Sequence, residues 1–267
     1  MENQDYLKQN KQLWNQRTAI HFKSDFYDVD GFIKSRNSLN QIERGLLGDL
    51  AGKSILHLQC HFGMDSLSLA NAGAMVTGID LSDVAIEKAI ELNQKLNLHA
   101  EFICCDIYEV PEVVNKQFDI VFTSYGTIGW LPDLNKWATV ISKSLKPGGL
   151  FLIVEFHPVL WMFDENIKEI KYAYFKEDAI IEAETGTYAD KSAQIENNIS
   201  ITWNHSLDEV FSALLNAGLK IELFKEYDFS PYHIFSNGLE NTPGKFMIRG
   251  LEGKLPLVYA VKATKPK

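Results

Sequence analysis

Residues 54–80 read SILHLQCHFGMDSLSLANAGAMVTGID, and this stretch decides the fold. It begins with a short apolar run at Ser54–Gln59. Apolar residues at helical spacing follow over Met64–Asn71, and a second apolar run covers Met75–Asp80. Gly73, between the last two, is typical of the end of a helix. A strand, a helix and a strand in this order predict two parallel strands of an α/β sheet.

The same alternation continues towards the C-terminus. It predicts helices at Ser82–Leu96, Asp133–Leu145 and Ser206–Ala217, and strands at Glu101–Cys105, Phe118–Thr123, Leu150–Glu155, Leu219–Tyr227 and Leu257–Lys262. Ser82 is a candidate N-cap, and Ser206 with Glu209 matches a capping box. Because the strands are apolar throughout, we expect helices on both faces of a doubly wound sheet.

Two segments interrupt the pattern. Residues 1–50 look helical and polar with interspersed aromatics, which suits either a cap over a site or a helical layer packed on the sheet edge. Residues 158–203 are rich in aromatics and predict an inserted antiparallel β segment, either a lid or a dimer contact. We therefore expect a single domain, in which residues 51–157 form a binding core and residues 204–267 close the sheet.

Composition narrows the functional classes. The 267 residues carry a formal net charge of −9, which disfavours a nucleic-acid partner. The three cysteines show no CxxC spacing, so a disulfide framework or a zinc knuckle is not expected. The N-terminus lacks an apolar signal core, and the most apolar stretch, Leu150–Phe156, is too short to cross a bilayer. These features favour a cytoplasmic protein without a membrane partner.

A metal site is also not expected. His57 and His61 have the spacing of zinc ligands on a helix, but they fall on a strand and the turn after it. That spacing brings two ligands together only on a helix.

Asp80 is the first candidate binding residue. It ends the second predicted strand, and in α/β sheets ligands bind beyond the carboxyl ends of the strands. A carboxylate there can accept hydrogen bonds from both hydroxyls of a ribose. A capping acid for the helix at Ser82 is the plainer alternative.

Five blocks together resemble the class I, Rossmann-like, S-adenosylmethionine-dependent methyltransferases. In chain order they are Ile55-Leu-His-Leu-Gln-Cys-His-Phe-Gly63, Val76-Thr-Gly-Ile-Asp-Leu-Ser-Asp83, Cys105-Asp-Ile107, Phe118-Asp-Ile-Val121 with Trp130-Leu-Pro-Asp133, and Leu145-Lys-Pro-Gly-Gly149. Each block alone is a weak signal, whereas five in the family's order and spacing are a strong one.

The resemblance implies a seven-stranded, mostly parallel sheet whose last strand is antiparallel. It implies that Gln59, Cys60, His61 and Gly63 wrap the methionine part of S-adenosylmethionine, and that Asp80 binds the ribose. Leu81 and Ile107 would flank adenine, with Asp106 accepting from its amino group. Ser124 and Tyr125 would lie near the sulfonium.

The first block departs from the family pattern. His57 replaces the usual acid, and Gln59 and His61 replace two of three glycines, so that only Gly63 remains. Glycines at such positions permit unusual dihedral angles and a close approach of the ligand. We expect Gln59 and His61 to hydrogen-bond the amino-acid end of the cofactor.

Methyl transfer asks mainly for alignment and exclusion of water, with a base only where the acceptor keeps a proton. His157 and Tyr125 are the candidate catalytic residues. Tyr27, Trp130, His157 and His205 are the candidate acceptor-binding residues. The sequence thus predicts a methyltransferase acting on a small-molecule oxygen or nitrogen acceptor, with a homodimer as a candidate assembly. The alternatives are an NAD(P)-dependent oxidoreductase and a non-catalytic S-adenosylmethionine-binding module.

Overall fold

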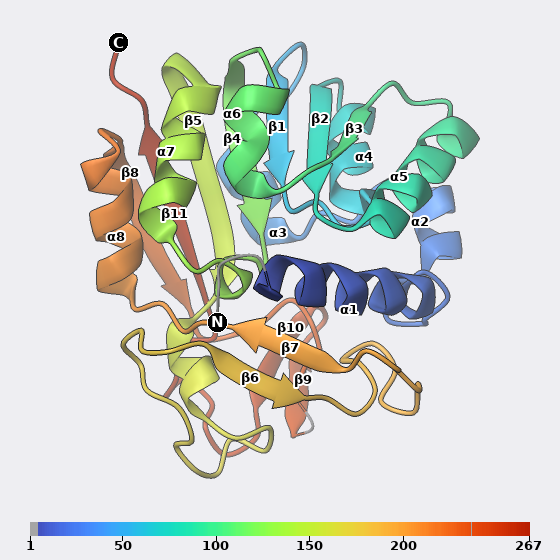
Figure 1. The fold of residues 1–267 in the computed structure, drawn as a ribbon, viewed down its shortest axis with the longest axis vertical. Helices are drawn as coiled ribbons and strands as arrows, with labels where there is room; N and C mark the ends of the chain where they lie inside the picture. The colour runs from blue at the N-terminus through green and yellow to red at the C-terminus, as the bar shows by residue number, and fades with distance from the viewer. Residues whose placement is uncertain (1–4, 236) are drawn as a thin grey trace.

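The computed structural model describes residues 5–235 and 237–267, and a seven-stranded sheet forms its centre (Figure 1). The strands are β1 Ser54–Leu58, β2 Met75–Asp80, β3 Glu101–Cys104, β4 Phe118–Ser124, β5 Leu145–Phe156, β8 Lys220–Tyr227 and β11 Val258–Thr264. Their order in the sheet is β3-β2-β1-β4-β5-β11-β8. Strands β1 to β5 pair in parallel, and β11 runs antiparallel to both β5 and β8. The predicted fold class is confirmed.

Helices cover both faces of this sheet. They are α1 Asp5–His21, α2 Val29–Ser35, α3 Gln41–Leu47, α4 Met64–Asn71, α5 Asp83–Leu96, α6 Val110–Val113, α7 Leu134–Ser144 and α8 Leu207–Asn216, with 3₁₀ turns η1 Ile107–Glu109, η2 Ile128–Trp130 and η3 Pro158–Met162. The two predicted N-caps form: the side chain of Ser82 accepts from the amide of Ala85 at 3.0 Å, and that of Ser206 accepts from Glu209 at 3.1 Å.

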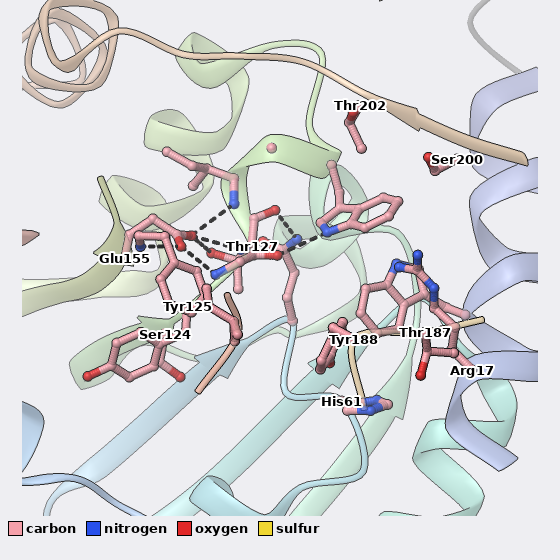
Figure 2. Close-up of a pocket in the computed structure, with 18 of the residues that line it drawn as sticks. Arg17, His61, Ser124, Tyr125, Thr127, Glu155, Thr187, Tyr188, Ser200 and Thr202 are labelled. Atoms are coloured by element: carbon pink, nitrogen blue, oxygen red, sulfur yellow. Dashed lines mark hydrogen bonds between the residues drawn. The ribbon is translucent and has the colours of Figure 1, made fainter. Parts of the chain in front are cut away.

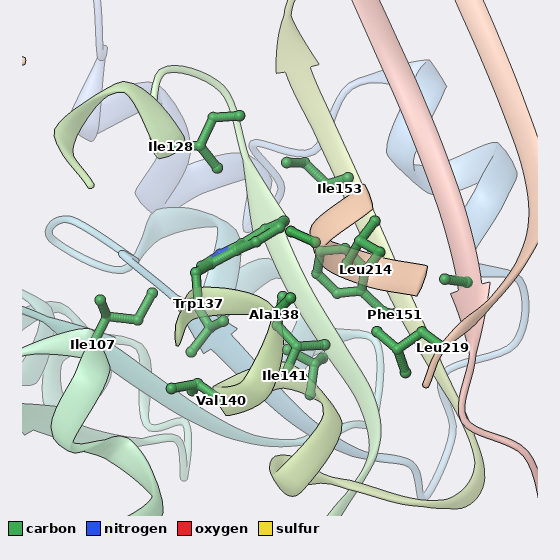
Figure 3. Close-up of a cluster of buried hydrophobic side chains, with 14 of the residues drawn as sticks. Ile107, Ile128, Trp137, Ala138, Val140, Ile141, Phe151, Ile153, Leu214 and Leu219 are labelled. Atoms are coloured by element: carbon green, nitrogen blue, oxygen red, sulfur yellow. The ribbon is translucent and has the colours of Figure 1, made fainter. Parts of the chain in front are cut away.

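Side chains of the sheet are buried alternately on its two faces, as a sheet covered on both sides requires. On one face Trp137 of α7 is fully buried, and its ring meets that of Phe151 at 5.5 Å and 81° (Figure 3). Leu214 of α8 packs in the same cluster, so the closing helix shares one core with the binding strands.

A roof lies across the carboxyl ends of the central strands (Figure 1). It consists of α1 and an antiparallel hairpin, β6 Ile180–Ala183 and β7 Ile199–Thr202, within the inserted segment. The buried amide of Asn10 joins the two, donating to the carbonyl of Ile201 at 2.8 Å and accepting from its amide at 3.0 Å. The inserted antiparallel segment is confirmed, and it packs on the N-terminal helix.

Two features differ from the sequence prediction. Strand β5 begins at Leu145, five residues early, because Leu145 pairs with Phe118 before the register shifts and Gly148 turns the chain at φ +78°. A second hairpin, β9 Gly238–Thr242 with β10 Lys245–Ile248, was not predicted, since β9 is polar, β10 is short, and neither shows apolar alternation. Within residues 5–235 and 237–267, no helix has the length and apolarity needed to cross a bilayer.

Candidate functional site

A cavity of about 1480 Å³ lies between the carboxyl edge of the sheet and the roof. Its walls include nearly every residue that the sequence singled out. These are Gln59, Cys60, His61, Gly63, Asp80, Leu81, Asp106, Ile107, Ser124, Tyr125, Tyr27, Trp130 and His205. The structure thus brings residues from both halves of the chain to one site.

The turn after β1 keeps the left-handed backbone conformation typical of glycine, although two of the family's three glycines are replaced. Gln59, His61 and Gly63 all adopt left-handed φ values, +54°, +51° and +78°. Only at Gly63 would a Cβ collide with its surroundings, 2.7 Å from the ring of Phe102. The backbone bend therefore survives the two substitutions, at a cost of about 1–2 kcal/mol for each non-glycine residue held there.

The side chains of this turn reach across the cavity. Gln59 Nε2 donates to the carbonyl of Thr127 at 2.8 Å, while its Oε1 is buried and has no hydrogen-bond partner among the described residues. His61 Nε2 lies 3.2 Å from Nδ1 of His21 in α1. Gln59 therefore has a buried acceptor that no described residue satisfies.

Asp80 ends β2 with both carboxylate oxygens held by backbone amides. Oδ2 accepts from His61 at 2.7 Å and Oδ1 from Ser82 at 2.9 Å. Burial raises the pKa of this carboxyl to about 6, against the opposing effect of these bonds. Each oxygen keeps a lone pair for a ligand hydroxyl.

Asp106 plays a comparable local role after β3. It is the N-cap of η1, with Oδ1 accepting from the amide of Tyr108 at 3.2 Å, and burial raises its pKa. Ile107 beside it is buried, so this part of the wall is apolar with one carboxylate.

Glu155, at the end of β5, holds the loop after β4 (Figure 2). Its buried carboxylate accepts from the amides of Gly126, Thr127, Ile128 and Phe156, and from the hydroxyl of Thr127 at 2.9 Å. Sequence reasoning missed this residue, because in the sequence it is simply an acid near the end of a strand. Its role depends on how the loop after β4 folds around it.

Tyr125 is in the wall, but its hydroxyl donates to the buried carboxylate of Glu43 at 2.9 Å. Burial first, and then the charge of Glu43, raises the pKa of Tyr125 well above its usual value. Its ring can shape the cavity, whereas its hydroxyl is held in the protonated form as a donor to Glu43.

His157 is not brought to the cavity, which corrects the sequence prediction. Its Nδ1 accepts from the amide of Val159 at 3.2 Å, as the N-cap of η3, and its Nε2 lies 3.1 Å from Glu226 of β8. Burial lowers its pKa. The chain turns at His157 into η3 and directs the ring towards the far strand of the sheet.

His205 lines the cavity, but protein atoms occupy both ring nitrogens. Nδ1 lies 2.9 Å from Glu209 and Nε2 lies 2.8 Å from the carbonyl of Leu131. These contacts fix the chain between β7 and α8, which gives His205 a structural role.

The roof contributes residues that sequence reasoning missed. Trp14 and Arg17 of α1 line the cavity, and the ring of Trp14 meets those of His61 at 5.3 Å and Trp130 at 5.2 Å. Tyr6, Asn10, Trp14 and Arg17 are spaced three or four residues apart, so they share one helix face. That spacing is the signal that could have identified them.

Comparisons with known proteins agree with this geometry. Residues 55–149 match a family model described as a methyltransferase domain. A ubiquinone biosynthesis O-methyltransferase of Idiomarina loihiensis is 28% identical over 130 residues, 47% of this chain and 53% of that protein. An S-adenosyl-L-methionine-dependent Diels-Alderase of Talaromyces variabilis is 34% identical over 124 residues, 44% of this chain and 42% of that protein.

The similarity of the fold covers more of the chain than the sequence similarity does. The crystal structure of an S-adenosylmethionine-dependent methyltransferase from Clostridium acetobutylicum aligns with a TM-score of 0.59 at 14% identity, over 95% of this chain and 99% of that one. The chain spans about half the length of the curated relatives it matches. Residues 55–149 are thus similar to methyltransferase domains, and the fold as a whole is that of the solved S-adenosylmethionine-dependent methyltransferase. The comparisons support neither the nicotinamide enzyme nor the non-catalytic module.

Proposed function

We propose that this protein transfers a methyl group from S-adenosylmethionine to an oxygen or nitrogen atom of a small molecule. One observation carries the proposal. The turn at Gln59–Gly63, the carboxylate of Asp80 and the carboxylate of Asp106 line a single cavity at the carboxyl edge of the sheet. Their chain order matches the methionine, ribose and adenine contacts that the family resemblance implies.

The donor set fits such a cofactor. The buried, unpaired Oε1 of Gln59 suits an ammonium group, and the free lone pairs of Asp80 suit a ribose diol. Leu81 and Ile107 offer apolar contact beside Asp106, as a purine ring with one amino group requires. Burial raises the pKa of the Cys60 thiol well above its usual value. The thiol therefore stays protonated, and Cys60 acts as a packing residue and not as a nucleophile.

The cofactor supplies a methyl group activated by its positive sulfonium. The chain's part is to align the reactants and exclude water. Burial lowers the pKa of His21 to about 3 and that of His61 well below its usual value, so both rings stay neutral at physiological pH. Neutral aromatic faces in this position favour a neighbouring cation, whereas imidazolium rings would repel it.

Aromatic residues form the remaining wall, which we assign to the acceptor. The hydroxyls of Tyr27 and Tyr188 lie 2.5 Å apart, Phe26 stacks on Tyr232 at 5.9 Å, and Tyr232 meets Tyr125 edge-on at 5.0 Å. The cavity exceeds the roughly 300–1,000 Å³ of an ordinary ligand pocket, which leaves room for an acceptor beside the cofactor. The wall favours an aromatic or largely apolar acceptor.

Fluorescence titration tests cofactor choice directly, because Trp14 and Trp130 lie in the cavity wall. S-adenosylhomocysteine should change the emission saturably, and NADH should not. The Trp14→Phe variant should lose much of the change. The Trp137→Phe variant is the matched control and should keep it, since Trp137 lies in the core. Preferential binding of NADH would overturn the assignment.

Transfer itself is tested with methyl-labelled S-adenosylmethionine and a panel of phenols, catechols and aromatic amines. Label should move to at least one acceptor class, and the unlabelled product S-adenosylhomocysteine should accumulate with it. Tight cofactor binding without transfer to any acceptor in the panel or in a metabolite extract would count against an enzyme.

A further inference from the structure

A buried guanidinium lies at the roof of the cavity, between α1 and the inserted hairpin (Figure 2). Arg17 is 3% exposed, and its guanidinium carbon lies 5.1 Å from the ring of Trp14 and 5.4 Å from that of Trp130. Its Nη2 donates to the carboxylate of Glu184, just after β6. Its Nε is also buried, and no atom of the described chain accepts from it. A buried donor without an acceptor destabilises the protein unless a ligand supplies one.

Among the described residues that line the cavity, Arg17 is the one arginine or lysine whose side chain is buried. Lys171 and Lys191, which also line the cavity, are exposed, and Lys171 lies 2.9 Å from Glu182. An anionic group of a ligand deep in the cavity therefore has one cation to pair with.

The position of Arg17 along α1 identifies which group that is. Near the start of the helix, Tyr6 lines the same cavity as Asp106, and burial, followed by the charge of Asp106, raises its pKa to about 12. We therefore place Tyr6 at the adenine end of the proposed site. Along α1, Arg17 lies between Trp14, whose ring meets that of His61 at 5.3 Å, and His21, whose Nδ1 lies 3.2 Å from His61 Nε2. Arg17 therefore lies over the turn after β1. The helix advances about 16 Å between Tyr6 and Arg17, at about 1.5 Å per residue. That length matches an extended adenosyl amino acid.

We propose that Arg17 binds the carboxylate of the cofactor's methionine part with its free edge while it keeps Glu184 on the other. This inference rests on the proposed function. A guanidinium presents a planar fork of donors and can hold two carboxylates at once. The cofactor then becomes part of the link between α1 and the hairpin.

The same link couples cofactor binding to the aromatic wall beside the hairpin. Thr187 and Tyr188 follow Glu184 in the chain and line the acceptor side of the cavity. The cofactor's carboxylate would use the donors of Arg17 that Glu184 leaves free, and the cofactor's own ammonium would offset the second negative charge. We therefore expect the hairpin and the aromatic wall beside it to be held more firmly when the cofactor is bound.

Ligand discrimination tests the carboxylate contact. The probes are S-adenosylhomocysteine and its decarboxylated analogue, which keeps the ammonium, with affinity measured by calorimetry. The unmodified protein should prefer S-adenosylhomocysteine by roughly 10- to 100-fold, the range expected of a charged hydrogen-bonded contact. Arg17→Met should reduce that preference to about threefold or less, and Arg17→Lys should restore part of it. Arg44→Met, at an exposed arginine of α3, is the matched control and should change nothing.

The outcomes separate the two proposals. If neither ligand binds the unmodified protein, the proposed function fails. If both bind equally, or if folded Arg17→Met still discriminates fully, the proposed function survives and the role of Arg17 is refuted. The unmodified protein alone answers the first question, so the test holds even if Arg17→Met does not fold.

Hydrogen exchange tests the link to the hairpin. S-adenosylhomocysteine should slow exchange over residues 180–202 in the unmodified protein. Glu184→Gln should keep the preference for the carboxylate but lose most of this protection. Full protection in Glu184→Gln would show that the hairpin closes without the Arg17–Glu184 pair, and would overturn the coupling.

Discussion

Gln59 Nε2 donates to the carbonyl oxygen of Thr127 at 2.8 Å, across 68 residues of sequence. The bond joins the turn after β1 to the loop after β4, and Thr127 is fixed in turn by the carboxylate of Glu155. Both loops border the cavity and act as one hydrogen-bonded unit. The side chain that replaces a glycine therefore adds a wall to the site and leaves the backbone course unchanged.

Exchanging Gln59 tests that conclusion. Gln59→Gly loses the bond to Thr127 but removes the strain of a φ of +54°, so the free energy of unfolding should change by less than about 1 kcal/mol. Affinity for S-adenosylhomocysteine should fall roughly tenfold, since Oε1 is lost as an acceptor. Thermal unfolding and calorimetry measure the two effects.

Gln59→Ala is the matched variant, because it also loses the amide but keeps a Cβ at a left-handed position. It should be less stable than Gln59→Gly by about 1 kcal/mol, with the same loss of affinity. Equal stability of the two variants would mean that the turn carries no strain.

The pH dependence of cofactor binding follows from Asp80. Its pKa in the free protein is about 6, because burial raises it. In the proposed site the carboxylate form would accept from both ribose hydroxyls, and the protonated form would lose part of that capacity. Affinity should therefore be constant above about pH 7 and fall below about pH 6, by at most about tenfold per pH unit for one proton.

The Asp80→Asn variant should bind weakly at every pH and should lose this dependence. Asp83→Asn is the control, since Asp83 pairs with Lys11 outside the cavity at 2.9 Å. It should bind normally and keep the pH profile. An unchanged profile in Asp80→Asn would assign the titration to another acid of the site, such as Asp106.

Glu155 should be the most costly cavity residue to alter. In the unmodified protein the carboxylate of Glu155 accepts from several backbone amides. In Glu155→Gln one carboxylate oxygen becomes an amide nitrogen, so buried amides of the 126–128 loop lose their acceptor. The free energy of unfolding should drop by about 2–4 kcal/mol in urea titration. Glu91→Gln, which removes an exposed ion pair with Lys88, should cost less than about 1 kcal/mol.

Much of the fold could be predicted from the sequence, because local rules and burial agree over the core. The apolar runs at β1, β2, β4 and β5 are long enough to be buried on both faces, and serine caps mark the starts of α5 and α8. The hairpin β9–β10 could not be predicted in this way. β9 is polar and partly exposed, and β10 is a four-residue run, so neither strand shows the apolar alternation that predicts a strand.

The candidate site likewise contains residues that the sequence could place and residues that it could not. Residues that end core strands, such as Asp80 and Ser124, face the cavity because every parallel strand ends at the same edge. Arg17 could not be placed by that rule, since its position depends on how α1 docks across the sheet. His157 shows the converse: it follows β5 directly, yet the turn into η3 directs its ring to Glu226.

The placement of His157 makes a final prediction that separates it from a histidine of the cavity. His157→Gln should leave the affinity for S-adenosylhomocysteine within about twofold of the unmodified protein and lower stability by about 1–2 kcal/mol, through loss of the η3 cap. His61→Asn is the matched variant, because asparagine tolerates the φ of +51° and keeps the amide that donates to Asp80. It should weaken binding several-fold, about 1 kcal/mol, since the ring leaves the cavity wall. If His157→Gln instead lost binding at unchanged thermal stability, the ring would have to reach the ligand, and the orientation towards Glu226 would be wrong.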